Sequence, residues 1–189
     1  MESFAGWKVA VTGGVGLLGL GTVRAFRMAG ATVIVPVRDA IEHEQLRVAC
    51  DDLVSGELVT VDADLIAQRS ATRFAGWIDS TIGDLDLVVA GPLAQHAAIR
   101  TLAPRIRQGC GVLAHVSERC PDNWPSGDAR VAGLLDPVAP RGIAVLGLVL
   151  DSAVNEQDIG PHLVRIVSCT EAARVVRSRE PGRDRALAA

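Results

Sequence analysis

The chain has 189 residues, of which 49% are hydrophobic and 22% charged, a composition typical of a globular protein with one substantial core. Its net charge of -3 gives no electrostatic basis for binding nucleic acid or an anionic membrane surface, and its apolar runs are too short to span a bilayer. The N-terminal stretch does not have the pattern of a secretory signal, so we expect a cytoplasmic protein. Lys8 is the one lysine, and tyrosine is absent.

Short apolar runs rich in β-branched residues alternate with amphipathic segments along the chain. The apolar runs predict strands at residues 8–12, 32–37, 57–61, 85–90, 111–117 and 142–150. The amphipathic segments predict helices at residues 17–29, 41–54, 65–82, 94–108, 128–136 and 158–176. Because the strands do not alternate with polar residues, they fit a parallel sheet buried on both faces. The sequence therefore predicts a doubly wound α/β fold in one domain over residues 1–177, followed by a flexible tail at 178–189.

The first predicted strand leads into the glycine-rich stretch TGGVGLLG, from Thr12 to Gly19. Gly13, Gly16 and Gly19 lie within a strand–turn–helix–strand unit of about 30 residues, the context in which such glycines bind a dinucleotide. The first glycine permits the turn, the second lets the backbone approach a pyrophosphate, and the third lets the helix pack closely. The alternative is a structural turn that has lost its ligand.

Two charged residues follow the second predicted strand. Arg38 comes directly after Val37, and Asp39 is next. A carboxylate here would accept a hydrogen bond from the ribose 2′-hydroxyl of NAD, whereas an arginine suits the 2′-phosphate of NADP. Because Arg38 is closer to the strand, we expect NADP(H), with NAD(H) as the alternative. A solvated pair of Arg38 and Asp39 without any ligand is also compatible with the sequence.

The four cysteines do not have metal-ligand spacing with one another or with the four histidines. We therefore expect no metal site. Free cysteines are among the most buried residues in globular proteins, so we expect reduced and mostly buried thiols.

These features together resemble the short-chain dehydrogenase/reductase family over nearly the whole chain. The resemblance rests on WKVAVTGGVGLLG at residues 7–19, VDADL at 61–65, LDLVVAG at 85–91 and GVLAHVSE at 111–118. It implies a Rossmann-like fold and a set of residues that bind the cofactor. These are Thr12, Gly13, Gly16, Leu17, Leu18 and Gly19 in the turn, Arg38 at the ribose, Asp64 and Leu65 at the adenine, and Ala90 and Gly91 beside the second ribose.

The catalytic pair of the family, Tyr-x-x-x-Lys, is missing. The best alignment places Ser126 and Arg130 there, and a serine hydroxyl is far less acidic than a phenol with its pKa of about 10. At the position of the family's catalytic serine the alignment gives Glu118, with Ser117 one residue earlier. We take Ser117 and Glu118 as the candidate catalytic residues. The alternative for Glu118 is a solvent-exposed ion pair with Arg119.

Three functions are compatible with this combination. The first is a divergent NADP(H)-dependent oxidoreductase acting on a small metabolite. The second is an enzyme of the same fold that performs non-redox chemistry, as a cyclase, isomerase or lyase. The third is a non-catalytic, nucleotide-binding partner subunit. The resemblance also implies a homo-oligomer such as a dimer, and we expect neither nucleic acid nor membrane as a partner.

Overall fold

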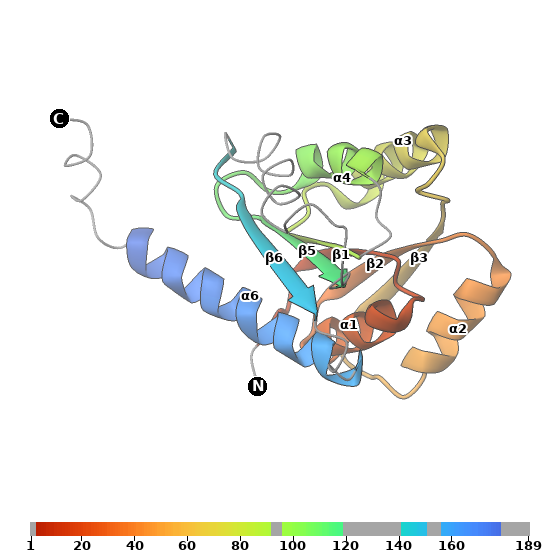
Figure 1. The fold of residues 1–189 in the computed structure, drawn as a ribbon, viewed down its shortest axis with the longest axis horizontal. Helices are drawn as coiled ribbons and strands as arrows, with labels where there is room; N and C mark the ends of the chain where they lie inside the picture. Colours follow the sequence, from red (N-terminus) through yellow and green to blue (C-terminus); the bar gives the residue numbers. More distant parts are fainter. Residues whose placement is uncertain (1–2, 92–95, 119–140, 151–155, 179–189) are drawn as a thin grey trace.

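The computed structural model describes residues 3–91, 96–118, 141–150 and 156–178. Six strands in these residues form one parallel sheet in the order β3-β2-β1-β4-β5-β6 (Figure 1). They are β1 (Lys8–Thr12), β2 (Thr32–Val37), β3 (Glu57–Asp62), β4 (Leu87–Ala90), β5 (Val112–Glu118) and β6 (Ala144–Leu150). Each strand lies within two residues of the run that predicted it, and the doubly wound, Rossmann-like fold is confirmed.

The helices of the described residues follow the predicted order. They are α1 (Leu17–Met28), α2 (Ala40–Cys50), α3 (Gln68–Trp77), α4 (His96–Leu102) and α6 (Glu156–Ser178), with a π-helical turn at Ile78–Ile82 and a 3₁₀ turn at Ala103–Arg105. The prediction of a helix to residue 108 is wrong, because Pro104 lacks the N–H that would continue α4. The predicted helix at 128–136 and residues 179–189 of the predicted tail lie outside the described residues.

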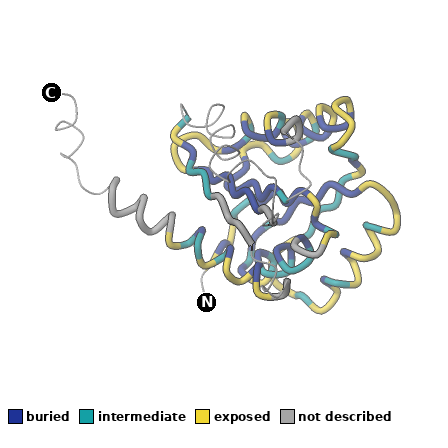
Figure 2. Tube along the Cα trace, in the orientation of Figure 1, coloured by how far each residue is buried: buried dark blue, intermediate teal, exposed yellow. Residues whose placement is uncertain are grey.

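Apolar side chains fill two layers, one on each face of the sheet. Helices α1, α2 and α6 cover one face, and α3 and α4 cover the other (Figure 1). Along β1, Val9 and Val11 pack with the first group of helices, while Ala10 packs with the second. The central strands are consequently buried along their length (Figure 2). Burial on both faces explains why the strand sequences show no polar alternation.

Two arginines of α1 fix the C-terminal end of α2. Arg24 makes a bidentate ion pair with Asp52, at 2.7 and 2.8 Å. Arg27 donates hydrogen bonds to the carbonyl oxygens of Cys50, at 3.0 Å, and Leu53, at 3.1 Å. The last carbonyls of a helix have no partner within the helix, so these donors satisfy them and hold α2 against α1.

Helix α6 touches α1 through its backbone. A Cβ atom added to Gly160 would lie 2.6 Å from the carbonyl carbon of Gly21 and 2.8 Å from Cβ of Ala25, closer than real atoms approach. The two helices can therefore reach this distance only with glycine at position 160. Since α1 begins at the glycine-rich turn, α6 helps to hold the element that follows the candidate nucleotide site.

We predict that Gly160→Ala lowers the free energy of unfolding by about 1–3 kcal/mol, because the added methyl group would push α6 away from α1. Gly76→Ala is the matched control: it lies in α3, and a Cβ there would meet no heavy atom within 4 Å. The free energy of unfolding of this control should rise by up to about 1 kcal/mol, because alanine has a higher helix propensity than glycine. Urea unfolding of both variants measures the difference, and equal stabilities would contradict the close contact.

Candidate nucleotide-binding site

The candidate site lies at the carboxyl edge of the sheet. Strand β1 pairs with β2 on one side and β4 on the other, so the strand order reverses at the ends of β1 and β4. Open α/β sheets bind ligands outside the carboxyl ends of their strands at such a reversal. Thr12 pairs in register with Ala90, and Ala90 pairs with His115 of β5. The glycine turn and the end of β4 therefore meet at this edge.

Thr12 ties the ends of β1 and β4 together. Its side chain is buried, and its hydroxyl group donates a hydrogen bond to the carbonyl oxygen of Val89 at 3.3 Å. The hydroxyl oxygen of Thr12 in turn accepts a hydrogen bond from the N–H of Gly91, also at 3.3 Å. A Cβ on Gly91 would lie only 3.0 Å from the carbonyl oxygen of Thr12, so the close approach favours a glycine there.

The glycine turn needs glycine for different reasons at different positions. Gly13 has a φ of +73°, a left-handed conformation that other residues rarely adopt. A Cβ on Gly19 would lie 2.6 Å from Cα of Gly14 and would also overlap the carbonyl group of Gly13. Gly14, which the sequence analysis did not single out, packs so tightly on Val35 of β2 that a Cβ would overlap that side chain. The first turn of α1 therefore lies directly on the backbone of the glycine turn.

Gly16 differs from its neighbours, because it is the N-cap of α1 and has room for a side chain. A Cβ there would make only an ordinary contact, 3.5 Å from the carbonyl oxygen of Gly13. Helix α1 begins without a side-chain cap and without an acidic residue in its first turn. Its N-terminus thus retains the positive end of the helix dipole for an anion. Leu17 and Leu18 open α1, and their side chains lie outside the described part of the structure.

Arg38, the residue expected to bind a 2′-phosphate, forms an ion pair with Glu42. Its Nε donates to Oε1 of Glu42 at 2.6 Å, Nη2 contacts the same oxygen, and the backbone N–H donates to Oε2 at 2.8 Å. The pKa of Arg38 is raised, chiefly by the hydrogen bond to Glu42. Asp39 instead caps α2, accepting the N–H groups of Ile41 and Glu42 at 2.9 Å each. The ion pair at this loop is therefore Arg38–Glu42 and not Arg38–Asp39.

Sequence reasoning missed Glu42, although a signal was present. Asp39 and Glu42 have the spacing of a capping box, in which a residue three positions into the helix bonds back to the backbone before it. Recognising that pattern would have placed the Glu42 carboxylate beside the loop that carries Arg38.

Asp64 and Leu65, the residues expected at the adenine, follow β3. Val37 and Asp62 pair in register, so the ends of β2 and β3 are neighbours. The carboxylate of Asp64 accepts the N–H of Ile66 at 2.9 Å, and the N–H of Asp64 donates to the hydroxyl oxygen of Ser70 at 3.0 Å. Leu65 is half-buried against the core beneath α3 and α4. Both residues thus lie at the same edge of the sheet as Arg38.

Ser117 and Glu118 are the last two residues of β5, where they pair in register with Val149 and Leu150 of β6. Their backbone thus reaches the carboxyl edge, while their side chains lie outside the described part of the structure. Ser126, the aligned replacement for the family's tyrosine, lies outside the described residues together with Arg130.

The single lysine lies at the other end of the sheet. Lys8 begins β1, and its Nζ donates a hydrogen bond to the carbonyl oxygen of Ile82. The backbone N–H of Lys8 donates to the carboxylate of Asp86, which also pairs with Arg107 at 2.8 Å. Lys8 therefore joins a network at the amino edge and is not positioned to act in chemistry at the carboxyl edge.

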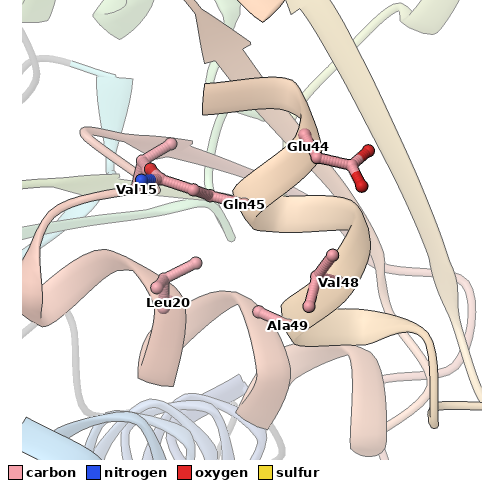
Figure 3. A pocket seen from close by; sticks show the side chains of 6 residues that line it. All are labelled: Val15, Leu20, Glu44, Gln45, Val48 and Ala49. Atoms are coloured by element: carbon pink, nitrogen blue, oxygen red, sulfur yellow. The ribbon is translucent and has the colours of Figure 1, made fainter. Parts of the chain in front are cut away.

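A separate groove of about 410 Å³ lies between α1 and α2 (Figure 3). It is lined by Val15, Leu20, Glu44, Gln45, Val48 and Ala49. The groove borders the glycine turn at Val15 but contains none of the residues expected to bind a cofactor. Glu44, at its rim, is paired with Arg47.

Other expectations concern cysteines, metals and membranes. Cys50 is buried, whereas Cys110 and Cys169 are exposed, so the expectation of buried thiols is wrong for the latter two. Among the described residues, no group of three or more His, Cys, Asp or Glu side chains could hold a metal ion. Within the same residues, no helix is long and apolar enough to cross a membrane.

Comparison with known proteins identifies the fold. No protein-family model and no curated protein sequence matches the chain. The fold is similar to that of a metagenomic short-chain oxidoreductase in complex with NADP, with a TM-score of 0.71, 18% identity, and coverage of 88% of this chain and 92% of that one. A dehydrogenase/reductase from Sinorhizobium meliloti 1021 gives a TM-score of 0.71 at 20% identity, covering 87% and 89%. An NADH-dependent reductase complexed with NAD gives 0.65 at 12% identity, covering 85% and 88%.

We predict that Gly19→Ala lowers the free energy of unfolding by about 1–3 kcal/mol, because the new methyl group would overlap the backbone of the glycine turn. Gly16→Ala should change it by less than about 1 kcal/mol, since its methyl group would make only ordinary contacts. Chemical denaturation of the two variants beside the wild type measures both effects. If Gly19→Ala is as stable as the wild type, the close packing of α1 on the turn is wrong.

Proposed function

We propose that the chain is an oxidoreductase that binds a nicotinamide dinucleotide at the glycine turn and acts on a small metabolite. The main support is the close packing of Gly19 against Gly13 and Gly14. This packing holds the uncapped N-terminus of α1 at the sheet edge where the strand order reverses between β1 and β4, a position at which helix N-termini bind phosphate groups. The complexes of similarly folded proteins with NADP and with NAD agree with this choice of ligand. We also propose that this oxidoreductase acts in the cytoplasm, as the sequence led us to expect.

The residues at the carboxyl edge fit such a cofactor. The pyrophosphate would lie over Gly13 and Gly16, where a Cβ at position 16 would overlap no protein atom and would make only an ordinary contact, 3.5 Å from the carbonyl oxygen of Gly13. The N–H groups that open α1 would donate to its oxygens, unopposed by any acidic side chain in that turn. Asp64 and Leu65 would meet the adenine, and Ala90 and Gly91 would leave room for the ribose on the nicotinamide side. Their positions along one edge support this assignment.

The bound cofactor supplies or accepts the hydride in this chemistry. The chain has to orient the substrate and move one proton at its oxygen atom. Lys8 is at the opposite edge and tyrosine is absent, so the proton has to come from another group. We assign that role to Glu118 or Ser117 at the end of β5, either directly or through water. A glutamic acid in an apolar site can have its pKa raised toward neutrality, as a general acid requires.

A non-redox enzyme on the same fold is the second candidate. The location of Lys8, far from the carboxyl edge, and the lack of tyrosine favour it, because the family's acid–base pair cannot be rebuilt from these residues. A cyclase, isomerase or lyase needs only a shaped pocket and one acid–base residue, a role that Glu118 could fill. Such an enzyme would not oxidise NADH or NADPH with any carbonyl substrate.

Binding of the dinucleotide is the first test. We predict that calorimetric titration with NADH or NADPH gives saturable binding, and that Gly16→Ala weakens it at least about tenfold while the fold stays intact, because the methyl group would occupy the place of the pyrophosphate. Gly76→Ala, remote from the site in α3, serves as the control with unchanged affinity. Failure of the wild type to bind either dinucleotide would rule out the proposed function.

The proton donor is the second test. Once a turnover assay exists, Glu118→Gln should lower kcat by about 10²–10⁴-fold if Glu118 transfers the proton, the range typical of general acid–base catalysis. Ser117→Ala, measured beside it, distinguishes the two candidates. Unchanged kcat in Glu118→Gln would remove this residue from the mechanism, and unchanged kcat in both variants would leave water as the donor.

A further inference from the structure

Both carboxylate oxygens of Glu42 are engaged by Arg38. Oε1 accepts from Nε at 2.6 Å and also contacts Nη2, and Oε2 accepts the backbone N–H at 2.8 Å. The Glu42 side chain is only 13% exposed, whereas that of Arg38 is 60% exposed. The guanidinium group is therefore held against the start of α2 by a mostly buried carboxylate.

Arg38 has more negative than positive charge around it. Asp39 is its neighbour in the chain and caps α2, and Asp64 follows the adjacent strand, β3. Both carboxylates act on the guanidinium in addition to Glu42. One positive charge thus faces three negative charges. A phosphate group would add further negative charge to this cluster, whereas a hydroxyl group would bring a donor for its oxygens.

We infer that Glu42 determines the choice of dinucleotide, by keeping Arg38 occupied and so disfavouring a ribose 2′-phosphate relative to a free 2′-hydroxyl. The inference rests on the proposed function, because it concerns the same cofactor. It selects NAD(H) and reverses the preference for NADP(H) that Arg38 alone suggested. The arginine is present, but its hydrogen-bonding capacity on the Nε side is already used.

Binding of a 2′-phosphate by the Nε side of Arg38 would require the guanidinium group to leave Glu42. The carboxylate would then stay behind in a mostly buried position without its partner, which is unfavourable for a charged group. The released guanidinium would also remain close to Asp39 and Asp64. A 2′-hydroxyl needs no such rearrangement, because it can donate to a carboxylate oxygen while the Arg38–Glu42 pair stays formed.

Glu42 also has a structural role, which the test has to separate from this one. Its bond to the backbone N–H of Arg38 resembles the capping box that stabilises the start of a helix. Glutamine can make the same bond through its side-chain oxygen, but it carries no charge. Glu42→Gln therefore removes the charge that holds Arg38 and retains the bond that supports α2.

The experiment measures the dissociation constants of NADH and NADPH for the full chain, together with AMP and adenosine 2′,5′-bisphosphate as probes of the adenosine half. We expect the wild type to bind NADH more tightly than NADPH. Glu42→Gln should strengthen NADPH binding about tenfold relative to NADH, since Arg38 becomes free for a charge-assisted contact. The same substitution should strengthen the binding of adenosine 2′,5′-bisphosphate relative to that of AMP by a similar factor. Thermal unfolding of the variant should match the wild type.

Two further variants locate the effect. Glu44→Gln removes the same charge from the same helix, but it breaks the separate Glu44–Arg47 pair, so it should leave the NADH/NADPH ratio unchanged. Arg38→Ala combined with Glu42→Gln should abolish the gain for NADPH. A wild type that prefers NADPH, or a ratio that Glu42→Gln does not change, overturns this inference alone. Absence of binding by both dinucleotides to wild type and variant overturns the proposed function and this inference together.

Discussion

The structure depends most on the contact between the first turn of α1 and the backbone of the glycine turn. Gly19 lies so close to Gly13 and Gly14 that a single added methyl group would overlap main-chain atoms. This contact sets the distance of α1 from β1 and directs the helix N-terminus toward the edge where β1 and β4 end. Helix α6 reaches α1 through Gly160, and two arginines of α1 hold the end of α2. One layer of the fold is thus assembled around the element that leaves the turn.

Electrostatics divides the carboxyl edge into two regions. The start of α1 has no acidic residue in its first turn, so it suits the phosphates of a dinucleotide. The segments that follow β2 and β3, by contrast, contain three carboxylates, those of Glu42, Asp39 and Asp64, whose charges all raise the pKa of the Arg38 guanidinium. A ligand that spans both regions would place its pyrophosphate at the first and its uncharged ribose at the second. Arg38 looks like a phosphate ligand in the sequence, but its guanidinium group is paired with the carboxylate of Glu42, one helical turn later.

The sequence predicted those features that depend on local pattern. Buried β-branched runs marked every strand of the described residues, and the spacing of the glycines marked the turn. Gly14 and Gly160 were not predicted, because their importance comes from Val35 and Gly21, which lie far from them in the chain. The end of α4 was missed although Pro104 was visible. Ser117, Glu118 and the whole set of cofactor contacts remain predictions, since the chemistry of a site depends on side-chain geometry that periodicity does not report.

Amide NMR during a titration with NADH tests whether the glycine turn binds a dinucleotide. We predict saturable shifts of the amide signals of Gly13, Gly16 and Gly19, with smaller shifts at Asp64 and Gly91. The amide of Gly76, in α3, should not move. The absence of any saturable change at the turn up to about 1 mM NADH, the upper end of ordinary affinities for small substrates, would contradict binding of a dinucleotide there.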